Sequence, residues 1–214
     1  AESTPIFKAG ADAVRALAAD TGRDLKVAVH FTNPEVPANL TGAAKQLDAA
    51  GVDYDIFASS YYPFWHGSLE NLTSVLSEVA TTYDKDVIVA ETAWNFTDED
   101  GDGQPNTVPT NTPADEAYPS SVQGQADAIR AVVQAVADVA DSRGAGVFYW
   151  EPAWVPVGPP EALEKNRLLW ERDGSGAATS YAAHYDPDVA GWHGGTSWDN
   201  LALFDFQGKA LESI

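Results

Sequence analysis

The chain has 214 residues, and its 32 aspartates and glutamates against 12 lysines and arginines give a formal net charge of −20. That charge argues against nucleic acid and anionic membrane surfaces as partners, because both bind basic patches. Cysteine is absent, which excludes disulfides and cysteine-ligated metals. No apolar run approaches the roughly 18 residues that a membrane-spanning helix needs.

Helix and strand patterns alternate along the first two thirds of the chain. Apolar residues at helical spacing predict a first helix over 6–19, and a β-branched run after Gly22 predicts a strand over 26–31. The same patterns then predict a helix at 42–50, a strand at 55–60, a helix at 69–83, a strand at 87–90, a helix at 121–142 and a strand at 146–150. The remainder, 151–214, is rich in aromatic residues and glycine and shows no clear period.

The four strands are apolar throughout, which is typical of parallel strands covered on both faces. They start at Val27, Ile56, Val87 and Val147, and a step of about 30 residues is one βα unit. The longer third step holds a polar, glycine- and proline-rich loop at 95–119. Four βα units predict an α/β fold, either a doubly wound sheet or half of a (β/α)8 barrel.

Polar residues cluster where each predicted strand ends. His30, Tyr61 and Tyr62, Glu91 and Trp150 all stand at such ends. In barrels and in open α/β sheets, that edge carries the chemistry. We therefore expect these side chains to meet at one site.

Glu91 directly follows the apolar run 87–90. A carboxylate in that place is costly unless it has partners or a function. It is either an ion-paired strand-end residue or a nucleophile or base.

Aromatic residues surround the other strand ends. Tyr61, Tyr62, Trp65 and His66 follow the second strand, and Trp94, Trp150 and Glu151 follow the third and fourth. Aromatic faces stack on sugar rings, and Tyr and Trp keep a polar group for hydroxyls, so we expect a carbohydrate-binding role. The alternative is that several of these aromatics belong to the core and that His66 is structural.

The segment 98–106 (DEDGDGQPN) is similar to a calcium loop, with oxygen ligands at alternating positions and glycines between them. Asp100 and Asp102 are its central acids. An EF-hand needs a bidentate Glu at the twelfth position, and Pro109 stands there, so other ligands must come from elsewhere. The alternative is a solvated acidic turn.

Several long stretches resemble glycoside hydrolase family 53, the endo-β-1,4-galactanases. They are KVAVHFTNPE, FASSYYPFWHG, VIVAETAWN, GVFYWEPAWVPVG, SGAATSYAAHYDP and GGTSWDNLALFDFQGKAL. The resemblance covers essentially the whole chain. It implies a (β/α)8 barrel that cleaves β-1,4-galactan, a side chain of pectin, with retention through two glutamates.

The resemblance also assigns roles to residues at the strand ends. Glu91 matches the nucleophile after strand seven, and Trp150 matches the aromatic beneath the sugar after strand eight. Tyr61 or Tyr62 matches the residue that hydrogen-bonds the nucleophile, and His30 stands at the end of strand five. We expect Trp65, His66, Trp94 and Glu151 to complete the substrate-binding site.

The family's acid/base glutamate stands in an Asn-Glu pair after strand four, and this sequence contains no Asn-Glu dipeptide. The chain thus resembles strands five to eight plus a C-terminal segment, as one part, 1–214, of a single catalytic domain. We expect it to need the N-terminal half of the barrel as its partner and to be inactive alone. It starts at Ala1 without methionine, so we expect that a leader was removed or that it is an internal piece.

Bacterial members of the family carry Ca²⁺ in the loop after strand seven, and we expect the same cofactor here. The ligands implied by the resemblance are Asp100, Asp102, the Gln104 carbonyl, Asn106, Thr196 and Asp199. We expect a secreted protein. The alternatives are a non-catalytic galactan-binding half-barrel and a retaining glycanase that acts on another polysaccharide, such as mannan or glucan.

Overall fold

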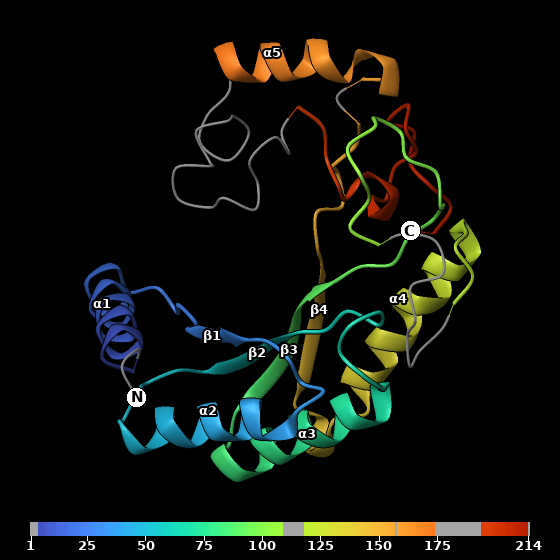
Figure 1. The fold of residues 1–214 in the computed structure, drawn as a ribbon. Coiled ribbons are helices and arrows are strands. Elements are labelled where there is room, and N and C mark those ends of the chain that lie inside the picture. The colour runs from blue at the N-terminus through green and yellow to red at the C-terminus, as the bar shows by residue number, and fades with distance from the viewer. Residues whose placement is uncertain (1–3, 109–117, 157, 174–193, 214) are drawn as a thin grey trace. The chain divides into compact units, whose positions relative to one another are not determined.

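The computed structural model describes residues 4–108, 118–156, 158–173 and 194–213 (Figure 1). The chain divides into two compact units. The first consists of 1–92, 114–117 and 128–150, and the second of 93–113, 118–127 and 151–214. None of the described helices is long and apolar enough to cross a membrane.

The first unit is built from alternating helices and parallel strands, as the sequence predicts. Its strands pair in the order β1-β2-β3-β4, and each neighbouring pair is parallel. The elements are α1 (Thr4–Thr21), β1 (Ala28–Phe31), α2 (Pro37–Ala49), β2 (Ile56–Ser60), α3 (Leu69–Tyr83), β3 (Asp86–Thr92), α4 (Val122–Ala137, which begins in the second unit), η1 (Ala140–Ser142) and β4 (Gly144–Tyr149).

Two helix boundaries differ from the prediction by more than two residues. Helix α2 begins at Pro37 rather than at position 42, because proline at the first helical position costs no hydrogen bond. Helix α4 ends at Ala137 rather than continuing to 142. Asp141 and Ser142 both have positive φ, at 59° and 56°, and therefore cannot extend an α-helix.

The consecutive strand order separates the two fold alternatives. In a doubly wound sheet the order reverses at a switch point and helices cover both faces. Here every strand lies beside its neighbour in sequence, and one hydrophobic cluster joins the helices to a single face of the sheet. That cluster includes Phe57 and Val87 from the strands and Leu40, Leu76 and Val136 from the helices. The sheet is therefore singly wound, as in a (β/α)8 barrel.

The expectation that all strands are covered on both faces is wrong for the two outer strands. Phe148 on β4 is 62% exposed, and His30 on β1 is also exposed. The inner strands β2 and β3 are buried over most of their length, as their apolar runs predict. A strand is exposed here because it lies at the edge of the sheet, and the hydropathy of its residues does not reveal that position.

The described residues of the second unit are mainly loop, and polar contacts join them. Gln125 is fully buried, and its side-chain amide donates to the carbonyls of Trp94 at 2.9 Å and Ala202 at 3.0 Å. Asn200, on the short helix η6 (Asp199–Leu201), is also fully buried and donates to the Thr97 carbonyl at 3.1 Å.

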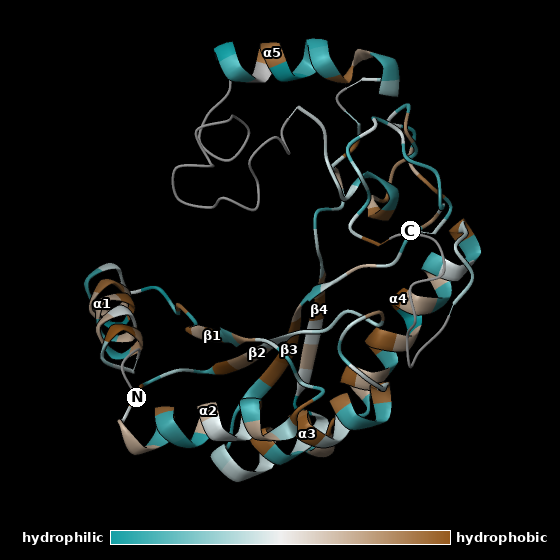
Figure 2. Ribbon diagram, viewed as in Figure 1, coloured by the Kyte–Doolittle hydropathy of each residue, from teal (hydrophilic) through white to brown (hydrophobic). Residues whose placement is uncertain are grey.

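The second unit also contains helices that the sequence pattern does not show. They are η2 (Pro160–Ala162) and α5 (Leu163–Asp173). Helix α5 is mostly hydrophilic (Figure 2), so its sequence lacks the apolar stripe from which a helix is predicted. One of its few apolar side chains, Leu168, is 64% exposed. The family-like stretch at 175–187 lies outside the described residues.

Candidate functional site

Glu91 stands near the end of β3, where the ladder between β2 and β3 is irregular. Ser60 pairs with Glu91, and the register shifts between Ser59 and Ser60. Bulges of this kind often lie next to active sites, where they redirect a side chain. The Tyr62 hydroxyl donates to Glu91 Oε2 at 3.0 Å, and the Glu91 side chain is 23% exposed. The carboxylate is thus held by a phenol and still accessible.

A histidine from β1 faces the same carboxylate. His30 Nε2 lies 2.9 Å from Ser60 Oγ, and His30 Nδ1 lies 3.9 Å from Glu91 Oε1. The structure therefore brings His30, Tyr62 and Glu91 together from three strand ends, as expected. Ser60 is an additional member that the predicted site residues do not include. Ser60 ends the predicted strand 55–60, and this position at a strand end is the sequence feature that could have identified it.

The two tyrosines after β2 have different roles. Tyr61 is fully buried, and its hydroxyl donates to the Gly67 carbonyl at 2.8 Å. The hydroxyl that donates to the Glu91 carboxylate is that of Tyr62. Of the two tyrosines that the resemblance left open, the structure selects Tyr62 as the partner of Glu91.

Trp65 and His66 lie in the loop that follows. Trp65 is 47% exposed, and its ring meets that of Tyr62 edge-on at 5.3 Å. His66 is buried, and its Nδ1 accepts the Tyr62 backbone N–H at 3.0 Å. Burial lowers the pKa of His66, whereas the carboxylates of Glu35 and Glu91 act to raise it. Trp65 is thus presented to solvent, while His66 faces inward.

The remaining predicted site residues are divided between the units. Trp150 directly follows β4, where its N–H donates to the Thr92 carbonyl at 2.8 Å, and its side chain is 36% exposed. Trp94 and Glu151 belong to the second unit. Trp94 is buried, and its indole N–H donates to the Pro119 carbonyl at 3.2 Å. Glu151 adopts a positive φ of 54°.

The Glu91 cluster supplies one part that covalent catalysis by a carboxylate requires, which is a positioned and accessible carboxylate. The carboxylate oxygen that is bonded to Tyr62 is fixed in direction, and a fixed nucleophile loses little freedom when it attacks. Exposed aromatic surface at Trp65 and Trp150 offers flat apolar contacts of the kind that sugar rings use.

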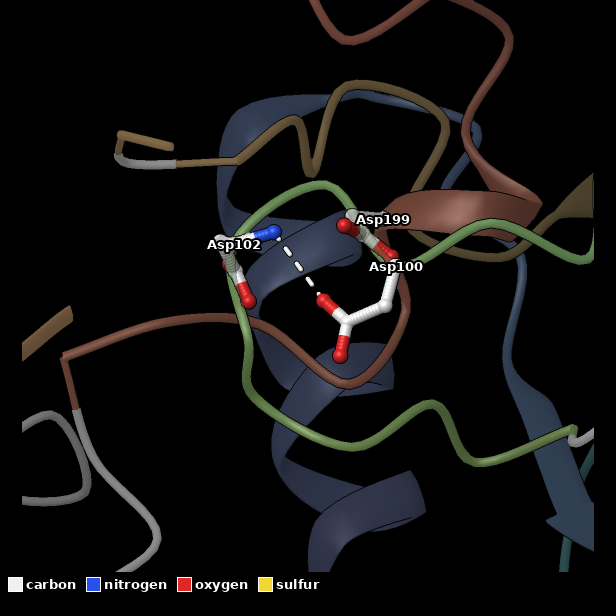
Figure 3. A group of neighbouring side chains, drawn as sticks. All are labelled: Asp100, Asp102 and Asp199. Atoms are coloured by element: carbon white, nitrogen blue, oxygen red, sulfur yellow. Dashed lines mark hydrogen bonds between the residues drawn. The ribbon is translucent and has the colours of Figure 1, made fainter. Parts of the chain in front are cut away.

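A cluster of three aspartates lies within the second unit. Carboxylate oxygens of Asp100, Asp102 and Asp199 all lie within 4.8 Å of one another (Figure 3). Asp102 and Asp199 are fully buried, although they stand in polar segments. Burial raises the pKa of Asp199 to about 7, and it also raises the pKa of Asp102. Three converging acids are costly to charge unless a cation joins them.

Backbone amides shape this acidic cluster. Asp102 accepts the N–H of Gln104 at 2.8 Å and that of Thr196 at 2.7 Å. Asp199 accepts the N–H of Gly101 at 2.9 Å. The loop therefore accepts a hydrogen bond from the C-terminal segment and also donates one to it. A Cβ on Gly195 would lie 2.8 Å from an Asp102 carboxylate oxygen, so only glycine permits this approach.

Several side-chain oxygens of this loop and of the C-terminal segment are buried without a hydrogen-bond partner. They include Asp199 Oδ1 and Asn106 Oδ1, which belong to the predicted ligand set, and Gln104 Oε1 and Asn200 Oδ1, which do not. Unsatisfied buried acceptors are rare in folded proteins and call for an explanation, such as an ion. The donor set is all oxygen, which suits a hard cation such as Ca²⁺. The residues present therefore fit the predicted cofactor.

Comparison with known proteins gives consistent matches. The family model described as Glycosyl hydrolase family 53 matches residues 1–214. The chain is 56% identical over 210 residues to the endo-beta-1,4-galactanase of Bacillus subtilis (strain 168), which covers 98% of this chain and 48% of that protein. It is 33% identical over 202 residues to the arabinogalactan endo-beta-1,4-galactanase of Cellvibrio japonicus (strain Ueda107), which covers 94% and 44%.

Solved structures give the same family. The Ignisphaera aggregans GH53 catalytic domain superposes with a TM-score of 0.68 at 30% identity, over 88% of this chain and 44% of that one. A structure from a study of two fungal beta-1,4-galactanases gives 0.57 at 26% identity, over 88% and 46%. The chain spans about half the length of the curated relatives it matches.

Proposed function

The chain belongs to glycosyl hydrolase family 53, and from this membership we propose that it supplies the nucleophile-bearing half of a retaining endo-β-1,4-galactanase. The single observation that carries the proposal is the strand-end Glu91 held at 3.0 Å by Tyr62, because it gives the chain a positioned nucleophile. The named activity of the Bacillus subtilis and Cellvibrio japonicus relatives supports galactan as the substrate.

We propose that β1 to β4 are strands five to eight of a (β/α)8 barrel. The consecutive parallel order and the helices on one face support this assignment. The exposure of Phe148 and His30, away from the helix-packed core, also supports it, since a barrel would enclose them. The N-terminal half of the barrel is then the chain's partner, and it pairs with the outer strands.

The proposed mechanism assigns roles to Glu91 and Tyr62. Glu91 attacks the anomeric carbon, a covalent glycosyl-enzyme forms, and the leaving sugar oxygen takes a proton from a second carboxylic acid about 5–5.5 Å from the first. The Tyr62 hydroxyl orients Glu91 for attack. The acid/base comes from the N-terminal half, because the sequence contains no Asn-Glu pair. Water then releases the sugar with retention.

A hybrid enzyme tests the substrate. In it, residues 1–214 replace the matching segment of the Bacillus subtilis relative, to which they are 56% identical. We expect release of reducing ends from β-1,4-galactan and little release from β-mannan or β-glucan. Preferential cleavage of mannan or glucan would identify a different retaining glycanase. Galactan binding without cleavage would indicate a non-catalytic half-barrel.

Trp150 should support turnover by stacking on the sugar. Trp150→Ala in the hybrid enzyme is expected to lower kcat/KM on galactan about fivefold, since an aromatic contact contributes about 1 kcal/mol and 1.4 kcal/mol is tenfold. Trp154→Ala is the matched control, because Trp154 is 51% exposed and stands outside the predicted site. An unchanged kcat/KM in folded Trp150→Ala would exclude Trp150 from the site.

We propose that Asp100, Asp102 and Asp199 bind Ca²⁺, together with the Asn106 side chain and the carbonyls of Gln104 and Thr196. The buried oxygens without partners and the three converging carboxylates support this. Bound Ca²⁺ would neutralise the acids and join the loop after β3 to the C-terminal segment. The substrate is a polysaccharide, so we also propose that the protein is secreted.

Removal of calcium should destabilise the chain. A site saturated at one hundred times its Kd contributes about 2.7 kcal/mol, so EDTA should lower the Tm by several degrees and excess Ca²⁺ should restore it. Asp199→Asn should abolish this response. Glu99→Gln is the matched control, because it removes one exposed charge from the same loop outside the ligand set. A melting curve that does not respond to EDTA would mean that the segment 98–106 is only a solvated acidic turn.

The effect of pH on the stability of the fold should depend on whether Ca²⁺ is bound. Because the pKa of Asp199 is about 7 in the fold and 3.8 in the unfolded chain, the folded state binds more protons between these values. Without a divalent cation, stability should therefore fall as the pH rises from about 4 to 8. Ca²⁺ binding displaces the proton, so the gain in Tm on adding Ca²⁺ should be larger at pH 8 than at pH 5.

A further inference from the structure

In the turn at 62–66, the backbone carbonyl and the backbone N–H of Tyr62 are both hydrogen-bonded to residues of the same turn. The Tyr62 carbonyl accepts the N–H groups of Trp65 and His66, each at 2.9 Å. The Tyr62 N–H donates to the His66 ring at Nδ1, at 3.0 Å. Both polar groups of the Tyr62 backbone are therefore satisfied inside the turn. His66 contributes its side chain to this arrangement as well as its backbone.

The side chain of Tyr62 is fixed as firmly as its backbone. Its ring stacks on Phe64 with centroids 5.4 Å apart, and the His66 ring lies 5.7 Å away. Its hydroxyl reaches Glu91 Oε2 at 3.0 Å. A chain of contacts therefore runs from the His66 imidazole through Tyr62 to the Glu91 carboxylate.

We propose that His66 is a positioning residue, which holds Tyr62 at its backbone N–H and thereby fixes the phenol that orients Glu91. This inference rests on the proposed function, because it gives His66 a role in the same reaction. It replaces the expectation that His66 binds the sugar. His66 is 5% exposed and its ring is already bonded at Nδ1, so it acts through Tyr62.

The protonation state of His66 follows from the same bond. A backbone N–H can only donate, so Nδ1 is the acceptor and the ring proton is on Nε2. Burial disfavours the imidazolium and lowers the pKa of His66. Two carboxylates oppose this effect: Glu35 in the loop after β1, and Glu91 on β3. The neutral ring is the form that keeps Tyr62 in place.

The consequence for turnover depends on the precision of the site. A misplacement of about 1 Å at a reacting group can cost roughly 10²-fold in rate. Loss of the Nδ1 acceptor frees the Tyr62 N–H and lets the turn shift relative to β3. Trp65 shares this turn and moves with it, whereas Trp150, which follows β4, keeps its place. The loss should therefore be much larger in kcat than in KM.

Three replacements separate the acceptor from the bulk of the ring. Asn carries its amide oxygen where His carries Nδ1, Gln carries it one bond further out, and Phe fills the space without an acceptor. In the hybrid enzyme we expect His66→Asn to keep kcat within about threefold. His66→Gln and His66→Phe should lower kcat roughly 10²-fold with KM little changed. Parent-like kcat in His66→Phe, or a loss carried by KM, would overturn the proposal.

A stability control excludes general damage. Thr73 donates to the Ala135 carbonyl at 2.9 Å between α3 and α4, away from the 62–66 turn. Thr73→Val should lower the Tm and leave the kcat of the hybrid enzyme unchanged at temperatures where it is folded. If Thr73→Val lowers kcat as much as His66→Phe does, the effect is one of stability and the positioning role is wrong.

A second readout does not need activity. In the chain 1–214, the Tyr62 amide should be protected from hydrogen exchange in the parent and in His66→Asn, and should exchange faster in His66→Phe. Equal exchange in all three would overturn the proposal. If the unsubstituted hybrid enzyme fails to cleave galactan, the proposed function is wrong. The exchange data would then still decide whether His66 holds Tyr62.

Discussion

Glu91→Gln in the hybrid enzyme is expected to reduce galactan hydrolysis by roughly four orders of magnitude or more, because it removes the nucleophile. Gln keeps the shape of the side chain and can still accept the hydrogen bond from Tyr62. Substrate binding should therefore persist. The expected outcome is a variant that binds galactan like the parent and does not turn it over.

Two assays are sufficient for this prediction. Reducing-end release measures turnover, and isothermal titration with galacto-oligosaccharides measures binding. Glu151→Gln is the informative comparison, because Glu151 is the other carboxylate that follows a predicted strand, and as a predicted binding residue it should lose far less activity than Glu91→Gln. Full activity in Glu91→Gln would remove Glu91 from the mechanism. Loss of activity in Glu151→Gln alone would transfer the catalytic role to that residue.

Residues 1–214 alone are expected not to hydrolyse galactan. Without a positioned acid the leaving oxygen departs as an alkoxide, and general acid catalysis typically contributes ~10²–10⁴-fold. The outer strands β1 and β4 also leave backbone groups and apolar side chains such as Phe148 exposed, which favours association. Addition of the N-terminal half should restore activity by supplying the acid/base and by covering these strands.

The comparison needs four samples assayed side by side on galactan. They are 1–214 alone, the N-terminal half of the Bacillus subtilis relative alone, the two mixed, and the hybrid enzyme. We expect activity in the hybrid enzyme, and in the mixture if the halves associate. Robust release by 1–214 alone would mean that the chain carries its own acid/base, with Glu151 the first residue to test.

The sequence predicts the first unit well because its signals are local. Apolar runs about 30 residues apart predict parallel βα units, and the strand ends of such a sheet must meet at one edge. The spacing of the runs is therefore enough to place His30 and Glu91 at the same edge. It does not choose between Tyr61 and Tyr62, because the choice depends on the irregular register at Ser60.

The second unit is less predictable because its contacts are long-range and polar. Thr196 bonds to Asp102 across 94 positions, and nothing in the local pattern of either residue shows this. The calcium ligands from the C-terminal segment come from the resemblance alone. Burial of Asp102 in a polar loop likewise depends on a segment far away in the sequence. Helix α5 lacks an apolar stripe and is missed for that reason.

The most direct test of Glu91 as the nucleophile is to trap the covalent intermediate. The hybrid enzyme is incubated with an activated 2-deoxy-2-fluoro-galactoside, which slows release of the glycosyl-enzyme, and is then digested and examined by mass spectrometry. We predict one added fluorogalactosyl group, carried by Glu91 in the peptide that contains β3. A label on Glu151 or on any other residue in an active hybrid enzyme would contradict this mechanism, as would galactan cleavage with inversion.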